Sequence, residues 1–91
     1  MARKRERLEV IYDILRIIRD SNNSIKPTPL LRYSNLSSQS FSDYFGELKE
    51  KGLVREVEGK RGRKSISLSD KGFRYLDKYQ VIAGFIDEFE L

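Results

Sequence analysis

Four basic side chains grouped around a glycine give this sequence its clearest chemistry. Residues 58–64 contain a single acid, Glu58, and carry a charge of +3 because they hold Lys60, Arg61, Arg63 and Lys64. Clustered side chains of one sign attract a polyanion through charge and leave its covalent bonds untouched. The segment therefore predicts contact with a nucleic-acid backbone. The alternative is ordinary solvated charge, which a chain with 35% charged residues also supplies.

The N-terminus holds a second basic cluster. Residues 1–7 also carry +3, whereas residues 77–91 carry −3 and the whole chain carries +4. Two basic clusters on a slightly acidic body are typical of a protein that binds a polyanion. We expect the N-terminal cluster to act as an arm that adds phosphate contacts through Arg3, Lys4 and Arg5.

Enzymatic chemistry finds little support in the composition. The chain has no cysteine and no histidine, which excludes disulfides, thiolate nucleophiles, Cys/His zinc sites and histidine acid–base catalysis. The carboxylates are interleaved with lysine and arginine on segments of helical spacing, which is the pattern of a charged surface. We therefore expect a protein that is not an enzyme. It should have no catalytic residue, no metal ion, no other cofactor and no small-molecule substrate.

Length and hydropathy bound the class of protein. A chain of 91 residues is enough for one domain with a modest core. It has no run of 18 apolar residues, so we expect no membrane contact. A charged segment, rather than the apolar stretch of a signal peptide, follows the basic N-terminus. We expect a cytoplasmic protein that is associated with the nucleoid.

The apolar positions of residues 5–20 recur at intervals of three and four, which predicts a helix. They form two neighbouring stripes rather than one. A helix with one amphipathic face needs a single stripe, so two stripes predict a helix that is covered from two sides. The stripes consist of Leu8, Ile11, Leu15 and Ile18, and of Val10, Ile14 and Ile17.

Two further helices are predicted, at residues 29–34 and 38–51. Thr28 is expected to cap the first, with Pro29 at its first helical position. Ser37 is expected to cap the second, and Gly52 suits the left-handed residue that ends it. A short helix, a tight turn and a longer helix form a helix-turn-helix.

Two short strands are predicted at residues 53–57 and 65–68. The first contains β-branched residues, and the second alternates polar and apolar side chains as a half-buried strand does. The basic segment 58–64 joins them into a hairpin. A hairpin in this position, after a helix-turn-helix, is a wing.

The last helix is predicted to begin after the capping residue Ser69, with Asp70 in its first turn and with Phe73 and Leu76 packed on the domain. If it reaches residue 91 it is about 33 Å long, which is long for so small a chain.

An apolar seam with heptad spacing follows along this helix. We expect the seam to join two copies into a homodimer. The alternative is that the helix folds back and the seam belongs to the core of its own chain. The predicted domains are therefore residues 1–68 for DNA binding and residues 69–91 for dimerisation. The seam consists of Tyr75, Tyr79, Ile82, Ile86 and Phe89.

Residues at caps, core positions and turns resemble those of a known family. They are Asn35-Leu36-Ser37, Tyr44, Leu48, Lys51-Gly52-Leu53-Val54 and Leu68-Ser69-Asp70-Lys71-Gly72. On these residues nearly the whole chain resembles the small archaeal winged-helix DNA-binding proteins, which include chromatin-associated and regulatory members. The resemblance implies a mainly helical α+β fold, a winged helix-turn-helix with a β-hairpin wing. It also implies a homodimer joined through a long C-terminal helix, often as an antiparallel coiled coil.

The outer face of the helix at 38–51 departs from that family's pattern, which has lysine or arginine there. This chain has Ser38, Gln39, Ser42 and Asp43 instead. Gln39 can pair with an adenine edge, whereas Asp43 repels phosphates unless it accepts from a cytosine amino group. The alternative for these residues is an ordinary polar helix face.

These features favour a homodimeric DNA-binding regulator or chromatin protein, with its helix-turn-helix in the major groove and its wing on the phosphate backbone. The binding can also be non-specific and architectural. A different class of function, a winged-helix module that docks other proteins and binds no DNA, is the alternative. There the aromatic C-terminal helix would grip the partner, and the wing charges would keep the protein soluble.

Overall fold

The computed structural model describes the chain from residue 3 to residue 91, with side chains from residue 7 onward. Its elements are α1 (Arg3–Asp20), α2 (Pro27–Ser34), α3 (Ser38–Glu50), β1 (Val54–Glu58), a short 3-10 turn η1 (Lys60–Gly62), β2 (Lys64–Leu68) and α4 (Asp70–Glu88). The predicted mainly helical α+β fold, with a hairpin after a helix-turn-helix, is confirmed. Within residues 3–91, no helix is both long enough and apolar enough to cross a membrane.

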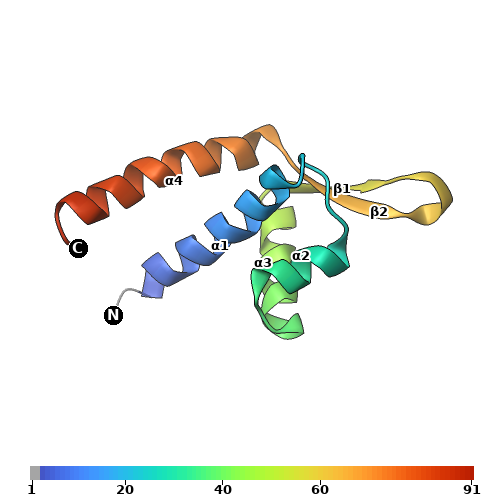
Figure 1. Ribbon diagram of the computed structural model, residues 1–91, viewed down its shortest axis with the longest axis horizontal. Coiled ribbons are helices and arrows are strands. Elements are labelled where there is room, and N and C mark those ends of the chain that lie inside the picture. Colours follow the sequence, from blue (N-terminus) through green and yellow to red (C-terminus); the bar gives the residue numbers. More distant parts are fainter. Residues whose placement is uncertain (1–2) are drawn as a thin grey trace.

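Helix α1 lies between α4 on one side and α2 and α3 on the other (Figure 1). The hairpin projects from the end of the molecule at which α4 begins, and both termini lie at the opposite end. The molecule is elongated, with extents of 50 × 26 × 21 Å. The wing and the far end of α4 are therefore widely separated.

The core forms around α1, which contacts α2, β2 and α4. Its side chains Ile14, Leu15 and Ile18 are completely buried. Both predicted stripes of α1 are covered, which confirms a helix that is packed on two sides. The other fully buried large side chains are Leu30, Leu48, Ile66, Leu68 and Leu76.

Helix α2 begins two residues earlier than predicted, at Pro27. Lys26, rather than Thr28, takes the capping position, and its side chain makes no capping hydrogen bond. Both prolines lie in the first turn of a helix, where a backbone N–H has no acceptor within the helix. Two missing N–H groups therefore do not weaken α2, and the fixed φ of proline favours its start.

The predicted limits of α3 rest on local interactions and hold to within one residue. Ser37 caps the helix, because its Oγ accepts the N–H of Ser40 at 3.1 Å. Gly52 adopts φ +74° just after the helix, in the left-handed conformation expected of it. The helix ends at Glu50.

Two strands and a single bridge form the small sheet. Strands β1 and β2 pair in antiparallel register, from Val54 opposite Leu68 at the base to the last pair near the tip. Ile25 adds a bridge on the other side of β2, where it exchanges backbone hydrogen bonds of 3.1 and 2.7 Å with Ile66. Asn23 Oδ1 also accepts the N–H of Leu68 at 2.7 Å. The segment after α1 is thereby fixed to the base of the hairpin.

Helix α4 begins as predicted, but the residue that packs against the domain in its first turn is not the predicted one. Ser69 Oγ accepts the N–H of Gly72 at 3.2 Å, and Leu76 is buried as expected. Phe73, which we expected to pack on the domain, is exposed. The closest approach is made by the buried Gly72, whose backbone lies against the carbonyl of Leu53. The helix ends three residues before its predicted end.

Gly72→Ala should destabilise the fold even though alanine favours helices. Its Cβ would collide with the carbonyl oxygen of Leu53, and overpacking of this kind costs about 1–3 kcal/mol. The matched control is Gly84→Ala in the same helix, where an added Cβ meets nothing within 4 Å. That control should gain roughly 0.5–1 kcal/mol. Urea unfolding measures both, and a shift of the same sign in the two variants would contradict the close contact.

Candidate nucleic-acid interface

The hairpin presents the predicted basic cluster at its tip. The ladder ends with Glu58 opposite Lys64, and the chain reverses through η1. Arg61 and Gly62 adopt left-handed conformations there, with φ of +61° and +70°. The four wing cations named from the sequence, Lys60, Arg61, Arg63 and Lys64, are all exposed.

A fifth cation, Lys26, joins this cluster from a distant part of the sequence. Because Ile25 pairs with Ile66 of β2, the next residue is placed beside the wing loop. Lys26 lines an open depression of about 430 Å³. Its other charged lining residues are Lys60, Arg61, Arg63 and Lys64. Sequence reasoning missed Lys26, since nothing in its local sequence indicates this pairing.

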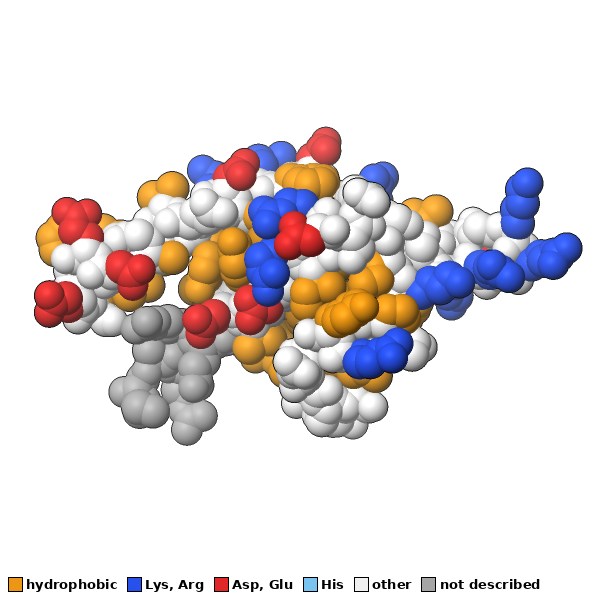
Figure 2. Space-filling model, in the orientation of Figure 1, with side chains coloured by type: hydrophobic (Ala, Val, Ile, Leu, Met, Phe, Trp, Pro, Cys, Tyr) orange, Lys and Arg blue, Asp and Glu red, His pale blue; other side chains and the backbone are white. Residues whose placement is uncertain are grey.

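The cations of this wing depression are free to meet phosphates. None of the five cations lies within 4.0 Å of a carboxylate oxygen on any side chain that the structure describes, from residue 7 onward. Figure 2 shows lysine and arginine side chains standing out at this end of the molecule. Lys64 is attracted by Glu56 of β1 at longer range, and after Lys49 this charge contributes to the lowered pKa of Glu56. The uncompensated charge of the depression therefore comes mainly from Lys26, Lys60, Arg61 and Arg63.

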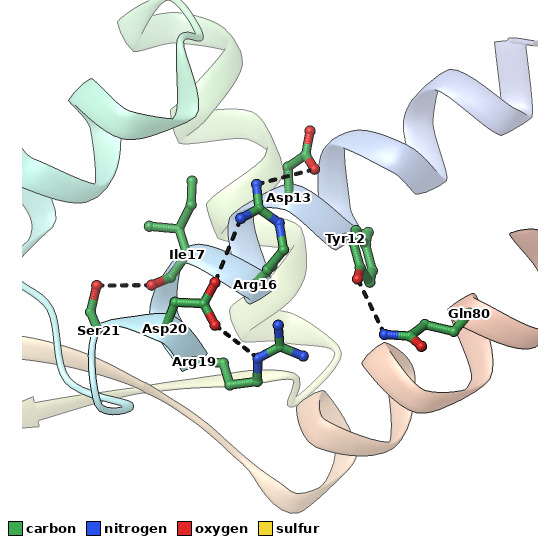
Figure 3. Close-up of polar contacts among 8 residues, drawn as sticks. All are labelled: Tyr12, Asp13, Arg16, Ile17, Arg19, Asp20, Ser21 and Gln80. Carbon is green, nitrogen blue, oxygen red and sulfur yellow. Dashed lines mark hydrogen bonds and ion pairs between the residues drawn. The ribbon is translucent and has the colours of Figure 1, made fainter.

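Basic residues of α1 contrast with those of the wing. Arg16 lies 3.8 Å from Asp13 and 3.6 Å from Asp20, and Arg19 lies 3.1 Å from the same Asp20 (Figure 3). These exposed pairs add little to stability. They do neutralise the arginines locally, so this face of α1 has little attraction for phosphates.

Basic residues around α3 are neutralised in the same way. Glu47 pairs with both Arg7 and Lys51, the latter at 2.7 Å. Lys49 Nζ lies 2.8 Å from Glu56 of β1. That hydrogen bond is the main reason why the pKa of Glu56 lies below its ordinary value, so the carboxylate stays charged and retains Lys49. The C-terminal half of α3 therefore offers few uncompensated charges.

The four predicted recognition residues lie on the exposed surface of α3: Ser38, Gln39, Ser42 and Asp43. Gln39 Nε2 donates to Asp43 Oδ1 at 3.1 Å, one turn further along the helix. The first two turns of α3 contain no lysine or arginine. This face can hydrogen-bond to bases, but it contributes no phosphate neutralisation.

Two further charged regions complete the electrostatic picture. The backbone of Arg3, Lys4 and Arg5, the predicted arm, forms the first turn of α1, and their side chains lie outside those described. The acidic residues at the end of α4 lie at the opposite end of the molecule from the wing, as the red and blue side chains of Figure 2 show. The acidic tail therefore does not cover the wing.

The predicted seam on α4 divides between two environments. Tyr75 and Tyr79 face α1 of the same chain, because Tyr75 OH donates to the Leu8 carbonyl at 2.8 Å and Tyr79 stacks on Tyr12 at 4.5 Å. Ile86 is half-buried in a cleft that is also lined by Tyr12. These three seam residues therefore pack on α1 of their own chain, as expected if the helix folds back on its own core.

The remaining seam residues, Ile82 and Phe89, are exposed. Val81 and Phe85, which the heptad did not include, are exposed beside them. The heptad spacing missed this pair because spacing alone does not say which face of α4 rests on α1. The exposed apolar stripe of α4 is therefore rotated from the predicted seam, and it consists of Val81, Ile82, Phe85 and Phe89.

Comparison with known proteins identifies this arrangement. A model of the winged helix-turn-helix family matches residues 4–86. No curated protein sequence matches the chain. The PcaV transcriptional regulator from Streptomyces coelicolor has a similar structure, with a TM-score of 0.74 at 18% identity, over 88% of this chain and 60% of that one.

Two further structures are similar. The same regulator in complex with its natural ligand gives a TM-score of 0.73 at 19% identity, over 89% of this chain and 58% of that one. A candidate transcriptional regulator from Pseudomonas aeruginosa PA01 gives 0.62 at 22% identity, over 91% and 60%. At these identities the likeness shows the fold, and the chain spans about three fifths of the length of these structures. The archaeal origin implied by the sequence resemblance stays a prediction.

The packing of α4 on α1 should be visible in the pH dependence of stability. Burial raises the pKa of Tyr75 to about 12, with a smaller contribution from Tyr79. The unfolded chain releases this proton near pH ~10. Stability from the buried phenol is complete below that pH and is lost as pH rises toward about 12, because the unfolded state ionises first.

Tyr75→Phe should therefore remove part of the alkaline loss of stability. Tyr33→Phe, which changes an exposed tyrosine of α2, should retain it. Urea unfolding between pH ~9 and ~12 measures both. Identical alkaline profiles for Tyr75→Phe and the wild type would show that the buried phenol does not contribute.

Proposed function

Because this chain belongs to the winged helix-turn-helix family, we propose that it binds double-stranded DNA as a homodimer and acts as a transcriptional regulator or chromatin protein. The observation that carries the proposal is the wing depression, where five cations lie without a carboxylate partner among the described residues. The protein acts by binding rather than by catalysis.

In this proposal the first turns of α3 enter the major groove and the wing follows the backbone. Gln39 reads an adenine edge, and Ser38 and Ser42 bond to neighbouring bases. To do so, Gln39 exchanges its exposed hydrogen bond with Asp43 for one to DNA. Such an exchange has a small net free energy, so this helix supplies modest specificity.

Most of the affinity comes from the wing. DNA carries one negative charge per ~1.7 Å of helix axis, and each phosphate neutralised by lysine or arginine releases a counterion. The wing depression holds five cations that have no carboxylate within 4.0 Å, whereas Arg16 and Arg19 of α1 are each paired with a carboxylate. Binding is therefore strong at low salt and depends weakly on sequence.

Replacement of Lys60, Arg61, Arg63 and Lys64 by alanine should weaken binding to every duplex alike. Each lost phosphate contact reduces the slope of log affinity against log salt by about 0.9, so the loss of four reduces it by about 3.6. Fluorescence anisotropy with short duplexes at several salt concentrations measures the slope.

The matched control for the wing variant is Arg16→Ala with Arg19→Ala, which removes two cations that already have carboxylate partners. This control should leave the slope unchanged. Binding by the wing variant equal to that of the wild type would overturn the wing as the phosphate contact. A wild-type protein that shifts no duplex at low salt would favour the docking module instead.

The homodimer in this proposal rests on the exposed apolar stripe of α4. Val81 is 73% exposed, Phe85 53% and Phe89 56%, and the last two rings lie 4.8 Å apart. Large apolar side chains that line one helix face mark an interaction site. The stripe lies on the part of α4 that extends away from the wing (Figure 1).

A second copy of the chain is the partner that fits. A two-fold axis brings the same face of each α4 together, so one stripe covers the other. Burial contributes roughly 1.5–3 kcal/mol for each such side chain before the cost of association. The dimer leaves both wings free, since they lie at the other ends of the protomers.

Phe85→Asp should convert the dimer to a monomer, because it places a charge in the centre of the apolar stripe. Tyr33→Asp is the matched control, since Tyr33 is 63% exposed and lies on α2, outside the stripe. Light scattering measures the mass of both. A wild-type protein of monomer mass, or a Phe85→Asp variant of dimer mass, would contradict the proposed interface.

A further inference from the structure

A second group of cations without carboxylate partners surrounds the start of α4. Arg55 of β1 and Lys71 and Arg74 of α4 line an open depression of about 320 Å³. All three are exposed, and none is within 4.0 Å of a carboxylate oxygen on any side chain from residue 7 onward. The other lining residues are Gly52, Ser69 and Asp70, so one acid opposes three cations.

One member of this α4 patch is held in place. Lys71 Nζ donates to the carbonyl of Lys51 at 2.8 Å, which leaves its ammonium two further donors. Arg55 and Arg74 make no ion pair with any described side chain and supply uncompensated charge. The patch thus resembles the wing and differs from the neutralised arginines of α1.

The α4 patch lies on a different face of the hairpin from α3. Val54 and Leu68 are paired and buried against the core. Side chains alternate along a strand, so the next pair, Arg55 and Ser67, projects from the opposite face of the sheet. Helix α3 packs against β1, and the core side chain Leu48 belongs to it. The patch is therefore turned away from the helix that enters the groove.

Distance along the elements also separates the two surfaces. The patch lies beside Gly52, after the C-terminal end of α3, whereas Ser38 and Gln39 lie in its first turn. At 1.5 Å per residue, the helix places about 20 Å between them. Figure 1 shows α4 on the opposite side of α1 from α2 and the first turns of α3. A stiff duplex seated on those first turns would not fold back over α4.

We propose that the α4 patch, made of Arg55, Lys71 and Arg74, binds the phosphate backbone of a second DNA segment, so that one protomer bridges two duplexes. The inference builds on the proposed DNA binding by the wing. Cations beside an open surface contact phosphates through charge alone, so this second contact is independent of sequence.

The first test isolates the patch from the wing. In the variant with Lys60, Arg61, Arg63 and Lys64 replaced by alanine, residual duplex binding should persist at low salt, because the α4 patch keeps its three cations. Addition of Arg55→Ala and Arg74→Ala should reduce the remaining slope of log affinity against log salt by about 1.8, two phosphate contacts at ~0.9 each. A wing variant with no residual binding overturns the patch while leaving the proposed function intact if the wild type still binds.

The second test measures bridging directly. In the Phe85→Asp background, where one protomer carries a single wing, a labelled duplex should be retained on beads that carry an unlabelled duplex of another sequence, and retention should require Arg55 and Arg74. The Arg55→Ala/Arg74→Ala variant should lose retention and keep both its affinity for one short duplex and its oligomeric mass. The control Arg16→Ala/Arg19→Ala should keep retention.

Two outcomes of the bridging test overturn the inference. Retention that survives in the Arg55→Ala/Arg74→Ala variant of the Phe85→Asp monomer would mean that another surface holds the second duplex. An equal loss of single-duplex affinity and of retention would place the patch on the same duplex as the wing. A wild-type protein that binds no duplex at all contradicts the proposed function, whereas these outcomes concern the patch alone.

Discussion

The burial of α1 from both sides is the constraint on which the rest of the structure depends. Ile14, Leu15 and Ile18 are completely buried, and the helix contacts α2, β2 and α4. Truncation of one such side chain costs about 2–5 kcal/mol, out of a total stability of about 5–15 kcal/mol for a domain. Because α1 is fixed in this way, the helix-turn-helix packs on one side of it and the long helix α4 packs on the other. The elongated shape, with the wing at one end and the acidic end of α4 at the other, follows from it.

Features that depend on neighbouring residues could be predicted from the sequence. Ser37, Gly52 and Ser69 mark helix ends through contacts within a few residues, and the structure places these ends within one residue of their predicted positions. Features that depend on distant segments could not. Lys26 reaches the wing only because Ile25 pairs with a strand far along the chain. The face of α4 that remains exposed likewise depends on where α1 lies, which the heptad spacing does not contain.

Whether a lysine or arginine is paired with a carboxylate decides its attraction for a phosphate more than how many basic residues lie near it in the sequence. Arg16 and Arg19 look as basic as the wing in the sequence, yet both lie within 4 Å of carboxylates. Arg16 meets acids three and four residues away on the helix, and Arg19 meets the adjacent Asp20, so these partners arise from the local sequence. In the wing, Glu58 lies opposite Lys64 in the ladder, yet neither it nor any other described carboxylate lies within 4.0 Å of a wing cation. Arg55, on the outer face of the hairpin, also lies beyond 4.0 Å of every described carboxylate, which is why both surfaces are proposed as phosphate contacts.

Salt acts on the two proposed interactions in opposite directions. The exposed apolar stripe of α4 lies next to Asp87, Glu88 and Glu90, so a two-fold axis through the stripe brings like charges of two copies together. Their repulsion is screened within about 10 Å at ~0.1 M salt, whereas apolar burial is not weakened. Phosphate contacts lose affinity over the same range. In the proposed assembly, higher salt strengthens the dimer and weakens the binding of each wing. Two wings per dimer compensate, because the second contact is made at high effective concentration. An acidic end next to the dimer contact thus keeps the repulsive charges as far as the fold allows from the DNA.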